Sequence, residues 1–375
     1  MQRIYFDNAA TTQLDPQVLN AMMPYLTDHF GNASSIYSYG RETRMAIENA
    51  RKQVANFLNT KPGELVFTSG GSESSNMAIQ CAVRDLGCNH IISSSIEHHA
   101  TLNTIEFIKS LQDIRVSYVK LTQEGHIDLV DLEALLSNSD KKTLVSLMHA
   151  NNEIGNLTDI AYVGELCDRS GAIFHSDTVQ TMAHYPLDLQ QLKVHFLSGS
   201  AHKFHGPKGN GLLYTNNNIQ IKPFLHGGGQ ERNMRAGTEN VAGIVGFAKA
   251  FSLSMEHHDE DMIYIRSLKN YMMEQLSATF STIIFHGDTG EQSLYTVLNS
   301  GFPVNERTEM LSINLDVAGI CVSGGSACSS GAQGGSHVIK GVYPHESKVP
   351  IRFSFNKHNT IEEIDTVILK ISEFL

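Results

Sequence analysis

Between about residues 40 and 250, the sequence alternates short apolar runs with segments of helix length. The helix-length segments include 98–111, 128–137 and 158–169, and an earlier helix is expected to end near Asn59. This alternation predicts an α/β fold, in which a mostly parallel sheet carries helices on both faces. The strands are expected at Glu64–Thr68, His90–Ser94, Val116–Leu121, Thr143–Met148, Ala172–His175 and Val194–Ser198.

After about residue 250 the pattern changes to long helices followed by isolated strands. A closing helix is expected to start at Thr360, because Thr360 and Glu363 have the spacing of a capping box. The other expected elements are helices at 240–256 and 259–279 and strands at 281–286, 310–315 and 350–355.

Length and composition fit a globular protein of two to three domains. The 375 residues are 41% hydrophobic, enough for large cores, and 28 basic against 39 acidic residues give a charge of −11. This charge argues against bulk binding of nucleic acid. We predict a large α/β domain over 15–250 and a small α+β domain formed by 1–14 and 251–375.

Neither a membrane segment nor a disulfide framework is indicated. No apolar run approaches the roughly 18 residues that span a bilayer, and the first residues lack the apolar core of a secretory signal. The five cysteines are odd in number and show no CxxC spacing, which argues against disulfides and a zinc ribbon. We therefore expect a soluble, cytoplasmic protein with reduced thiols, at positions 81, 88, 167, 321 and 328.

One cysteine lies in an unusual context. The segment Ser323–Ser336 consists almost entirely of Gly, Ser and Ala, so it is expected to be mobile and to offer Cys328 no packing partner. A thiol on such an arm suits a nucleophile that reaches into a site and swings away, although an unused cysteine in a linker fits the same pattern. The other four cysteines are interpreted as packing residues.

Two motifs follow expected strands and suggest chemistry. Lys203 lies among Ser, His and Gly after the run that ends at Ser198, where a partly desolvated amine could form a Schiff base. Asp177 ends another strand, and a buried carboxylate there requires a cation such as a pyridinium nitrogen. The alternatives are a surface loop for Lys203 and a helix cap for Asp177.

A third motif, Thr68–Asn76, joins a strand to a helix through small residues. Backbone N–H groups at such a helix start can bind a phosphate. The segment matches neither GxxxxGK[ST] nor GxGxxG, so a single phosphate ester is favoured over a nucleotide. A tight turn with a good helix cap is the alternative.

Two further patterns do not indicate a site. The histidines of Glu97-His98-His99, together with His202 and His205, lack an HExxH motif, so no metal site is predicted. The segment His226–Gly229 is similar to a lipase oxyanion loop, but the chain contains no G-x-S-x-G.

Taken together, the motifs resemble those of the cysteine desulfurases, pyridoxal 5'-phosphate enzymes of fold type I in the class V aminotransferase group. The resemblance implies a large domain with a seven-stranded, mostly parallel sheet. The matching segments are FDNAATT (6–12), FGNASS (30–35), FTSGGSESSN (67–76), EHHA (97–100), MHANNEIG (148–155), HSDTVQ (175–180), SAHKFHGPKG (200–209), HGGGQERNMRAGT (226–238), SGGSACSSG (323–331) and IRFSF (351–355).

The resemblance implies roles for individual residues around the cofactor. Lys203 would form the Schiff base and move the substrate α-proton, and Asp177 would pair with the pyridinium nitrogen. Gln180 would bind the phenolate oxygen, and His98 would stack on the ring as an acid/base. The other implied cofactor-binding residues are Asn152 and, around the phosphate, Gly71, Ser72, Ser200, His202 and, from a neighbouring subunit of a homodimer, Thr238.

On the substrate side, the resemblance implies that Arg352 binds the carboxylate of L-cysteine, assisted by Asn152 and Asn32. Cys328 would attack the substrate sulfur and carry it as a persulfide, leaving L-alanine. Ala33 and Tyr37 stand where relatives usually have Pro and His. The short Gly-rich tail after Cys328 also differs from the family pattern.

The resemblance thus implies a cysteine desulfurase that delivers sulfur to an acceptor protein for iron–sulfur cluster assembly or tRNA thiolation. Two alternatives keep the cofactor but change the reaction, to a selenocysteine lyase or a class V aminotransferase. A non-enzymatic alternative is a metal- or sulfur-carrying protein. It would use His98, His99, His202, His205 and Cys328 as ligands.

Overall fold

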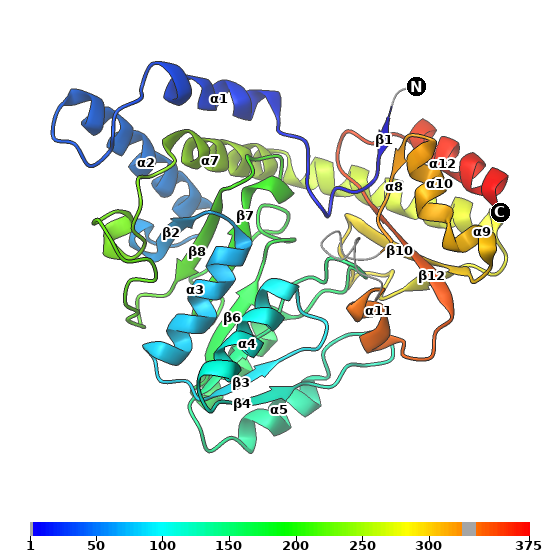
Figure 1. Ribbon diagram of the computed structural model, residues 1–375, viewed down its shortest axis with the longest axis horizontal. Coiled ribbons are helices and arrows are strands. Elements are labelled where there is room, and N and C mark those ends of the chain that lie inside the picture. The colour runs from blue at the N-terminus through cyan, green and yellow to red at the C-terminus, as the bar shows by residue number, and fades with distance from the viewer. Residues whose placement is uncertain (1–2, 325–334) are drawn as a thin grey trace.

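The computed structural model describes residues 3–324 and 335–375, and its largest element is a seven-stranded sheet (Figure 1). The strand order is β2-β8-β7-β6-β5-β3-β4, and only β8 runs against the other six. The predicted mostly parallel α/β sheet is therefore confirmed. Its strands are β2 (Leu65–Thr68), β3 (His90–Ser93), β4 (Arg115–Tyr118), β5 (Thr143–Ser146), β6 (Ile173–Asp177), β7 (Phe196–Ser200) and β8 (Gly211–Thr215).

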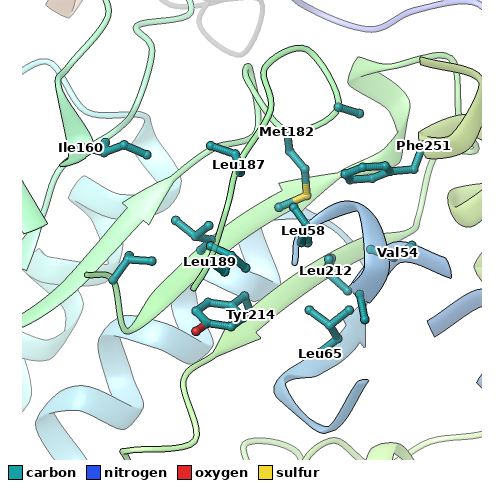
Figure 2. Close-up of a cluster of buried hydrophobic side chains, with 14 of the residues drawn as sticks. Val54, Leu58, Leu65, Ile160, Met182, Leu187, Leu189, Leu212, Tyr214 and Phe251 are labelled. Atoms are coloured by element: carbon teal, nitrogen blue, oxygen red, sulfur yellow. The ribbon is translucent and has the colours of Figure 1, made fainter. Parts of the chain in front are cut away.

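Helices cover both faces of this sheet because neighbouring strand residues point to opposite sides. Ile91 packs into a cluster with α3 and α4, whereas Ile92 packs into a second cluster with α2, α5, α6 and α7. Figure 2 shows part of the second cluster, where Leu212 of β8 lies among Val54, Leu58 and Phe251. The helices are α1 (Pro16–Thr27), α2 (Ser38–Phe57), α3 (Gly71–Arg84), α4 (His99–Leu111), α5 (Leu129–Ser137), α6 (Ile160–Ser170) and α7 (Val241–Glu256).

A separate hydrophobic cluster lies over the C-terminal part of the chain. It combines α8, α10 and α12 with a three-stranded antiparallel sheet of order β12-β10-β9, and Phe6 of the N-terminal arm is buried in it. The pairing of β1 with β11 joins the arm to the same region. These contacts support the two-domain division, which stays a prediction. The elements are β1 (Ile4–Tyr5), α8 (His258–Thr279), β9 (Ile284–His286), β10 (Val297–Pro303), α9 (Glu306–Glu309), α10 (Leu311–Val317), β11 (Ile320–Cys321), α11 (His337–Val342), β12 (Lys348–Ser354) and α12 (Ile361–Phe374).

In the C-terminal region, strand β10 was not predicted from the sequence, one predicted strand is wrong and one predicted helix cap is confirmed. The strand expected at 310–315 is wrong, because this segment lies in helix α10. Leu311 and Leu315 are buried on one face of that helix, whereas Ile313 between them is exposed. The capping box at Thr360 is confirmed: its hydroxyl accepts from the Glu363 N–H, and the Glu363 carboxylate accepts from the Thr360 N–H.

Candidate active site

The carboxyl ends of the parallel strands open into a cavity of about 210 Å³. Ligands of open α/β sheets bind at this edge, because loops and helix N-termini converge there. Ten of the predicted site residues line this active-site cavity, and they come from six separate parts of the chain. They are Gly71, Ser72, His98, Asn152, Asp177, Gln180, Ser200, His202, Lys203 and Arg352.

Lys203 follows β7 in a single 3-10 turn, Ala201–Lys203, and its amine points to the N-terminal arm. Nζ donates to the main-chain carbonyl oxygens of Ala9 and Ala10, the latter at 2.9 Å. Gln180 donates to the same Ala9 carbonyl at 3.0 Å. The arm thus holds the lysine and the glutamine on one side of the cavity.

Asp177 ends β6 with its side chain buried at the cavity wall. One carboxylate oxygen accepts from the Val179 N–H at 2.9 Å. Burial raises the pKa of Asp177 to about 6, while the positive charge of Lys203 acts in the opposite direction. A carboxylate in this position gains from a cationic ring nitrogen placed against it.

His98 is the N-cap of α4. Its Nδ1 accepts from the Ala100 N–H at 3.1 Å, which leaves the proton of the neutral ring on Nε2. Burial lowers the pKa of His98 to about 4, and the charge of Lys203 contributes to this shift. The imidazole is therefore neutral near pH 7, so it can stack on an aromatic ring and accept or donate a proton.

The opposite end of the cavity is built to hold an anion. Helix α3 begins there at Gly71, so its unpaired N–H groups and its dipole favour a negative charge. At Gly71 a Cβ atom would lie 2.5 Å from Cγ2 of Val179, so only glycine fits this approach. His202 is held by a 3.1 Å contact between its Nδ1 and the Thr11 hydroxyl.

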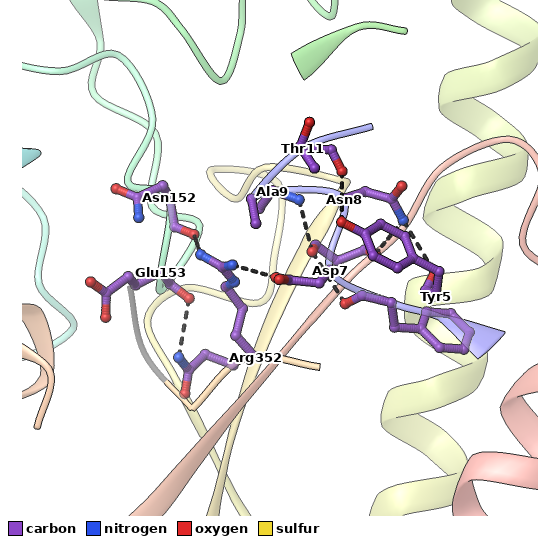
Figure 3. Close-up of polar contacts among 12 residues, drawn as sticks. Tyr5, Asp7, Asn8, Ala9, Thr11, Asn152, Glu153 and Arg352 are labelled. Atoms are coloured by element: carbon purple, nitrogen blue, oxygen red, sulfur yellow. Dashed lines mark hydrogen bonds and ion pairs between the residues drawn. The ribbon is translucent and has the colours of Figure 1, made fainter. Parts of the chain in front are cut away.

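Arg352 of β12 completes the cavity and is almost fully enclosed, with 1% of its side chain exposed. Figure 3 shows its guanidinium between the arm and the loop after β5. Nη1 donates to the Asn152 carbonyl oxygen at 2.9 Å, and Nη2 donates to the Asp7 carboxylate at 2.6 Å. Nε has no hydrogen-bond partner among the described residues.

Two predicted residues, Asn32 and Thr238, do not line this cavity. Asn32 is exposed between α1 and α2, where its side chain accepts from the Ser34 N–H. Thr238 is exposed at a smaller hollow of about 70 Å³, beside Ser69 and Arg235. Cys328 lies outside the described residues, so its role and the expected mobility of its segment stay predictions.

The sequence interpretation assigned no role to the N-terminal arm beyond its family motif. The structure shows that Asp7, Ala9, Ala10 and Thr11 contact four of the predicted site residues. The match of FDNAATT to the family pattern was the one sequence signal for this segment. Its contacts join residues that are far apart in the sequence, so no local pattern could reveal them.

The four cysteines among the described residues lack the character of reactive thiolates. Cys81, Cys88 and Cys167 are buried, as expected of packing residues, and Cys321 is half-buried on β11. Burial raises the pKa of all four thiols, to about 12 for Cys81 and about 11 for Cys88. Each is therefore protonated near neutral pH.

The metal-carrying alternative gains no support from the geometry. Across residues 3–324 and 335–375, no three or more His, Cys, Asp or Glu side chains come close enough together to hold a metal ion. Over the same residues, no helix combines the length and apolar character required to cross a membrane.

The protein has a seven-stranded, mostly parallel sheet. A lysine, a buried aspartate and the start of a helix suited to an anion lie at its carboxyl edge. This combination defines a pyridoxal-phosphate-dependent enzyme of fold type I. The family model for aminotransferase class-V matches residues 4–367. The chain belongs to the class-V aminotransferase family, and its relatives place it among the cysteine desulfurases of that family.

Three similar proteins illustrate this placement. The cysteine desulfurase IscS of Clostridium botulinum is 40% identical over 373 residues, covering 98% of this chain and 93% of the relative. A NifS-like protein of known structure superposes with a TM-score of 0.91 at 35% identity, covering 99% of both chains. SspA, solved in complex with cysteine, superposes with a TM-score of 0.81 at 29% identity, covering 96% of this chain and all of SspA.

The residues present fit pyridoxal phosphate at four points. The cavity combines an anion-binding helix start, a buried carboxylate that accepts from a main-chain N–H, a neutral imidazole and a primary amine. These groups suit, in that order, the phosphate, the ring nitrogen, the ring face and the aldehyde of the cofactor.

Asp177→Asn should stabilise the cofactor-free protein near neutral pH. Burial raises the pKa of Asp177 from 3.8 to about 6, so the folded state binds the proton more tightly than the unfolded state. The free energy of unfolding therefore falls as pH rises from about 4 to 6, by up to about 3 kcal/mol. The side-chain amide of the variant carries no charge and escapes this loss.

Urea unfolding of the cofactor-free protein at several pH values tests this expectation. Asp177→Asn should exceed wild type in stability at pH 7.5 and match it near pH 3.5. Asp113→Asn, at an exposed position, is the control and should follow wild type throughout. Equal pH dependence in wild type and Asp177→Asn would contradict the assigned cost of the buried charge.

Proposed function

We propose that the protein converts L-cysteine to L-alanine and carries the released sulfur as a persulfide on Cys328. The observation that supports this most strongly is the convergence of Lys203, Asp177, His98 and Arg352 on one cavity in a chain of this family. SspA, a structural neighbour, is described in complex with cysteine, the substrate proposed here.

Four residues that line the cavity are proposed to bind the substrate or to move its protons. Arg352 binds the substrate carboxylate through a planar guanidinium, assisted by Asn152. Bound pyridoxal phosphate supplies an electron sink, which makes the substrate α-proton removable. The Lys203 amine moves that proton, and the neutral imidazole of His98 supplies or accepts a second one.

Sulfur transfer balances without an external oxidant or reductant. The Cys328 thiolate attacks the substrate sulfur, a new S–S bond forms, and the bond between substrate Cβ and sulfur breaks. The electron pair of the broken bond stays with the carbon fragment, which takes up protons and leaves as alanine. The net change converts a thiol and L-cysteine into a persulfide and L-alanine.

We also propose two protein partners, a second copy of this chain in a homodimer and a protein that accepts the sulfur. Thr238 is exposed outside the active-site cavity, which suits a residue that reaches the phosphate of a second copy in a homodimer. Asn32 is likewise proposed to act on the substrate side. The persulfide would pass to a protein acceptor for iron–sulfur cluster assembly or tRNA thiolation, in the reducing environment of the cytoplasm.

An assay of purified protein with L-cysteine, pyridoxal phosphate and a thiol reductant tests the activity. We expect alanine and sulfide in equal amounts. Parallel reactions with selenocysteine and with pairs of amino donors and keto acids separate the two enzymatic alternatives. Turnover of selenocysteine or of an amino-donor pair, with no alanine formed from L-cysteine, would contradict the proposal.

A further inference from the structure

Asp7 is a charged residue of the N-terminal arm to which the proposed reaction assigns no task. Its carboxylate lies 2.6 Å from Nη2 of Arg352, and its side chain is largely buried. The two residues are 345 positions apart in the chain. Removing one member of a buried ion pair leaves the other charge buried without compensation, which is destabilising. Replacement of Asp7 should therefore also affect Arg352.

The main chain of Asp7 is fixed as firmly as its side chain. It forms a bridge to Ser354, two residues after Arg352 on β12. Its carbonyl oxygen accepts from the N–H groups of Ala10 at 3.0 Å and Thr11 at 3.4 Å. The resulting turn presents the Ala9 and Ala10 carbonyl oxygens to the Lys203 amine. Asp7 therefore joins the guanidinium and the amine through one short stretch of chain.

The hydrogen bonds around Arg352 leave room for a carboxylate. A guanidinium has five N–H donors, and the bonds to Asp7 and to the Asn152 carbonyl oxygen use two of them. Nε is among the remaining three donors and is buried without a partner among the described residues. A bidentate carboxylate needs two donors in one plane, so Arg352 can bind it while Asp7 keeps its place.

We infer that Asp7 is the positioning residue that fixes the guanidinium plane of Arg352 relative to Lys203, and that it thereby determines selectivity for substrates carrying an α-carboxylate. This inference rests on the proposed function. Asp7 is not among the residues that line the active-site cavity, so we expect it to contact neither the substrate amine nor the sulfur. Its loss should weaken recognition of the carboxylate and leave recognition of the amine unchanged.

L-cysteine and cysteamine differ only in the carboxylate, and they provide the test. Binding of each to the cofactor-loaded protein is followed by the absorption spectrum of the cofactor, beside KM and kcat for L-cysteine. In Asp7→Ala, the dissociation constant and KM for L-cysteine should rise about ten- to a hundred-fold, with little change in kcat or in cysteamine binding. Asp7→Asn keeps an acceptor for Nη2 and should recover part of the loss.

Thermal unfolding of each variant, with Asp113→Ala as the surface control, shows whether the fold is kept. If Asp7→Ala unfolds, Asp7→Asn carries the comparison, and its preference for L-cysteine over cysteamine should fall below that of wild type. Equal weakening of both ligands, or an unchanged preference in a folded variant, would overturn the inference. A wild-type protein that binds both ligands equally would also overturn the inference, whereas only the absence of alanine formation from L-cysteine would overturn the proposed function.

Discussion

Lys203→Ala should abolish conversion of L-cysteine, with a loss on the order of a thousand-fold or more. The variant would lack the amine that we propose bonds to the cofactor aldehyde and moves the substrate α-proton. The purified variant should also lose the visible absorption of lysine-bound cofactor. Alanine formation and the absorption spectrum measure the two effects separately.

Lys208 provides a matched control because it is exposed in the same loop, five residues further on. Lys208→Ala should keep the absorption and most of the activity. The loss of the Lys203 contacts to Ala9 and Ala10 costs about 1 to 3 kcal/mol of stability, so thermal unfolding must show that the variant is still folded. A folded Lys203→Ala protein with wild-type turnover would contradict the assignment.

Cys328→Ser should eliminate the protein-bound persulfide and lower sulfide release by about a hundred-fold or more. Serine is nearly isosteric with cysteine, but its hydroxyl stays protonated near neutral pH and cannot accept sulfur. Binding of L-cysteine and the spectral change of the cofactor should persist, because this variant leaves Lys203, Asp177 and Arg352 intact. Mass spectrometry of the protein after a single turnover detects the extra sulfur atom.

Cys321→Ser is the matched control for this experiment. Cys321 is half-buried on β11, and burial raises the pKa of its thiol, so it should contribute nothing to sulfur transfer. Full sulfide output from Cys328→Ser, or a persulfide located on Cys321, would show that another group receives the sulfur.

The cofactor end of the site could be predicted from the sequence because strand ends determine it. Asp177 ends one buried run and Lys203 closely follows another. The two runs are neighbouring parallel strands of one sheet, and the carboxyl ends of such strands meet at one edge. The small residues of Thr68–Asn76 suggested either a phosphate site or a tight capped turn, and only the family resemblance assigned Gly71 to the phosphate. Both site residues lie at or just after the end of a strand, and the two strands follow each other in the sequence, so short stretches of sequence were enough for this prediction.

The remaining features depend on contacts between distant segments. Asp7 and Arg352 meet only because β12 and the N-terminal arm lie side by side in the folded chain. The segment 310–315 alternates apolar and polar residues as a strand would, yet burial of Leu311 and Leu315 on one face makes it a helix. Strand β10 was missed because Asn299, Ser300 and Gly301 are typical of turns, although Asn299 is buried and hydrogen-bonded to His286.

In the resting enzyme, we expect Lys203 to be bonded covalently to pyridoxal phosphate. Treating the purified protein with borohydride makes this bond permanent, and peptide mass spectrometry then locates the modified residue. We predict loss of the visible absorption and one pyridoxyl group per chain, on the peptide that contains Lys203. An unmodified Lys203, or a pyridoxyl group on another lysine, would contradict the assignment of Lys203 as the cofactor-binding lysine.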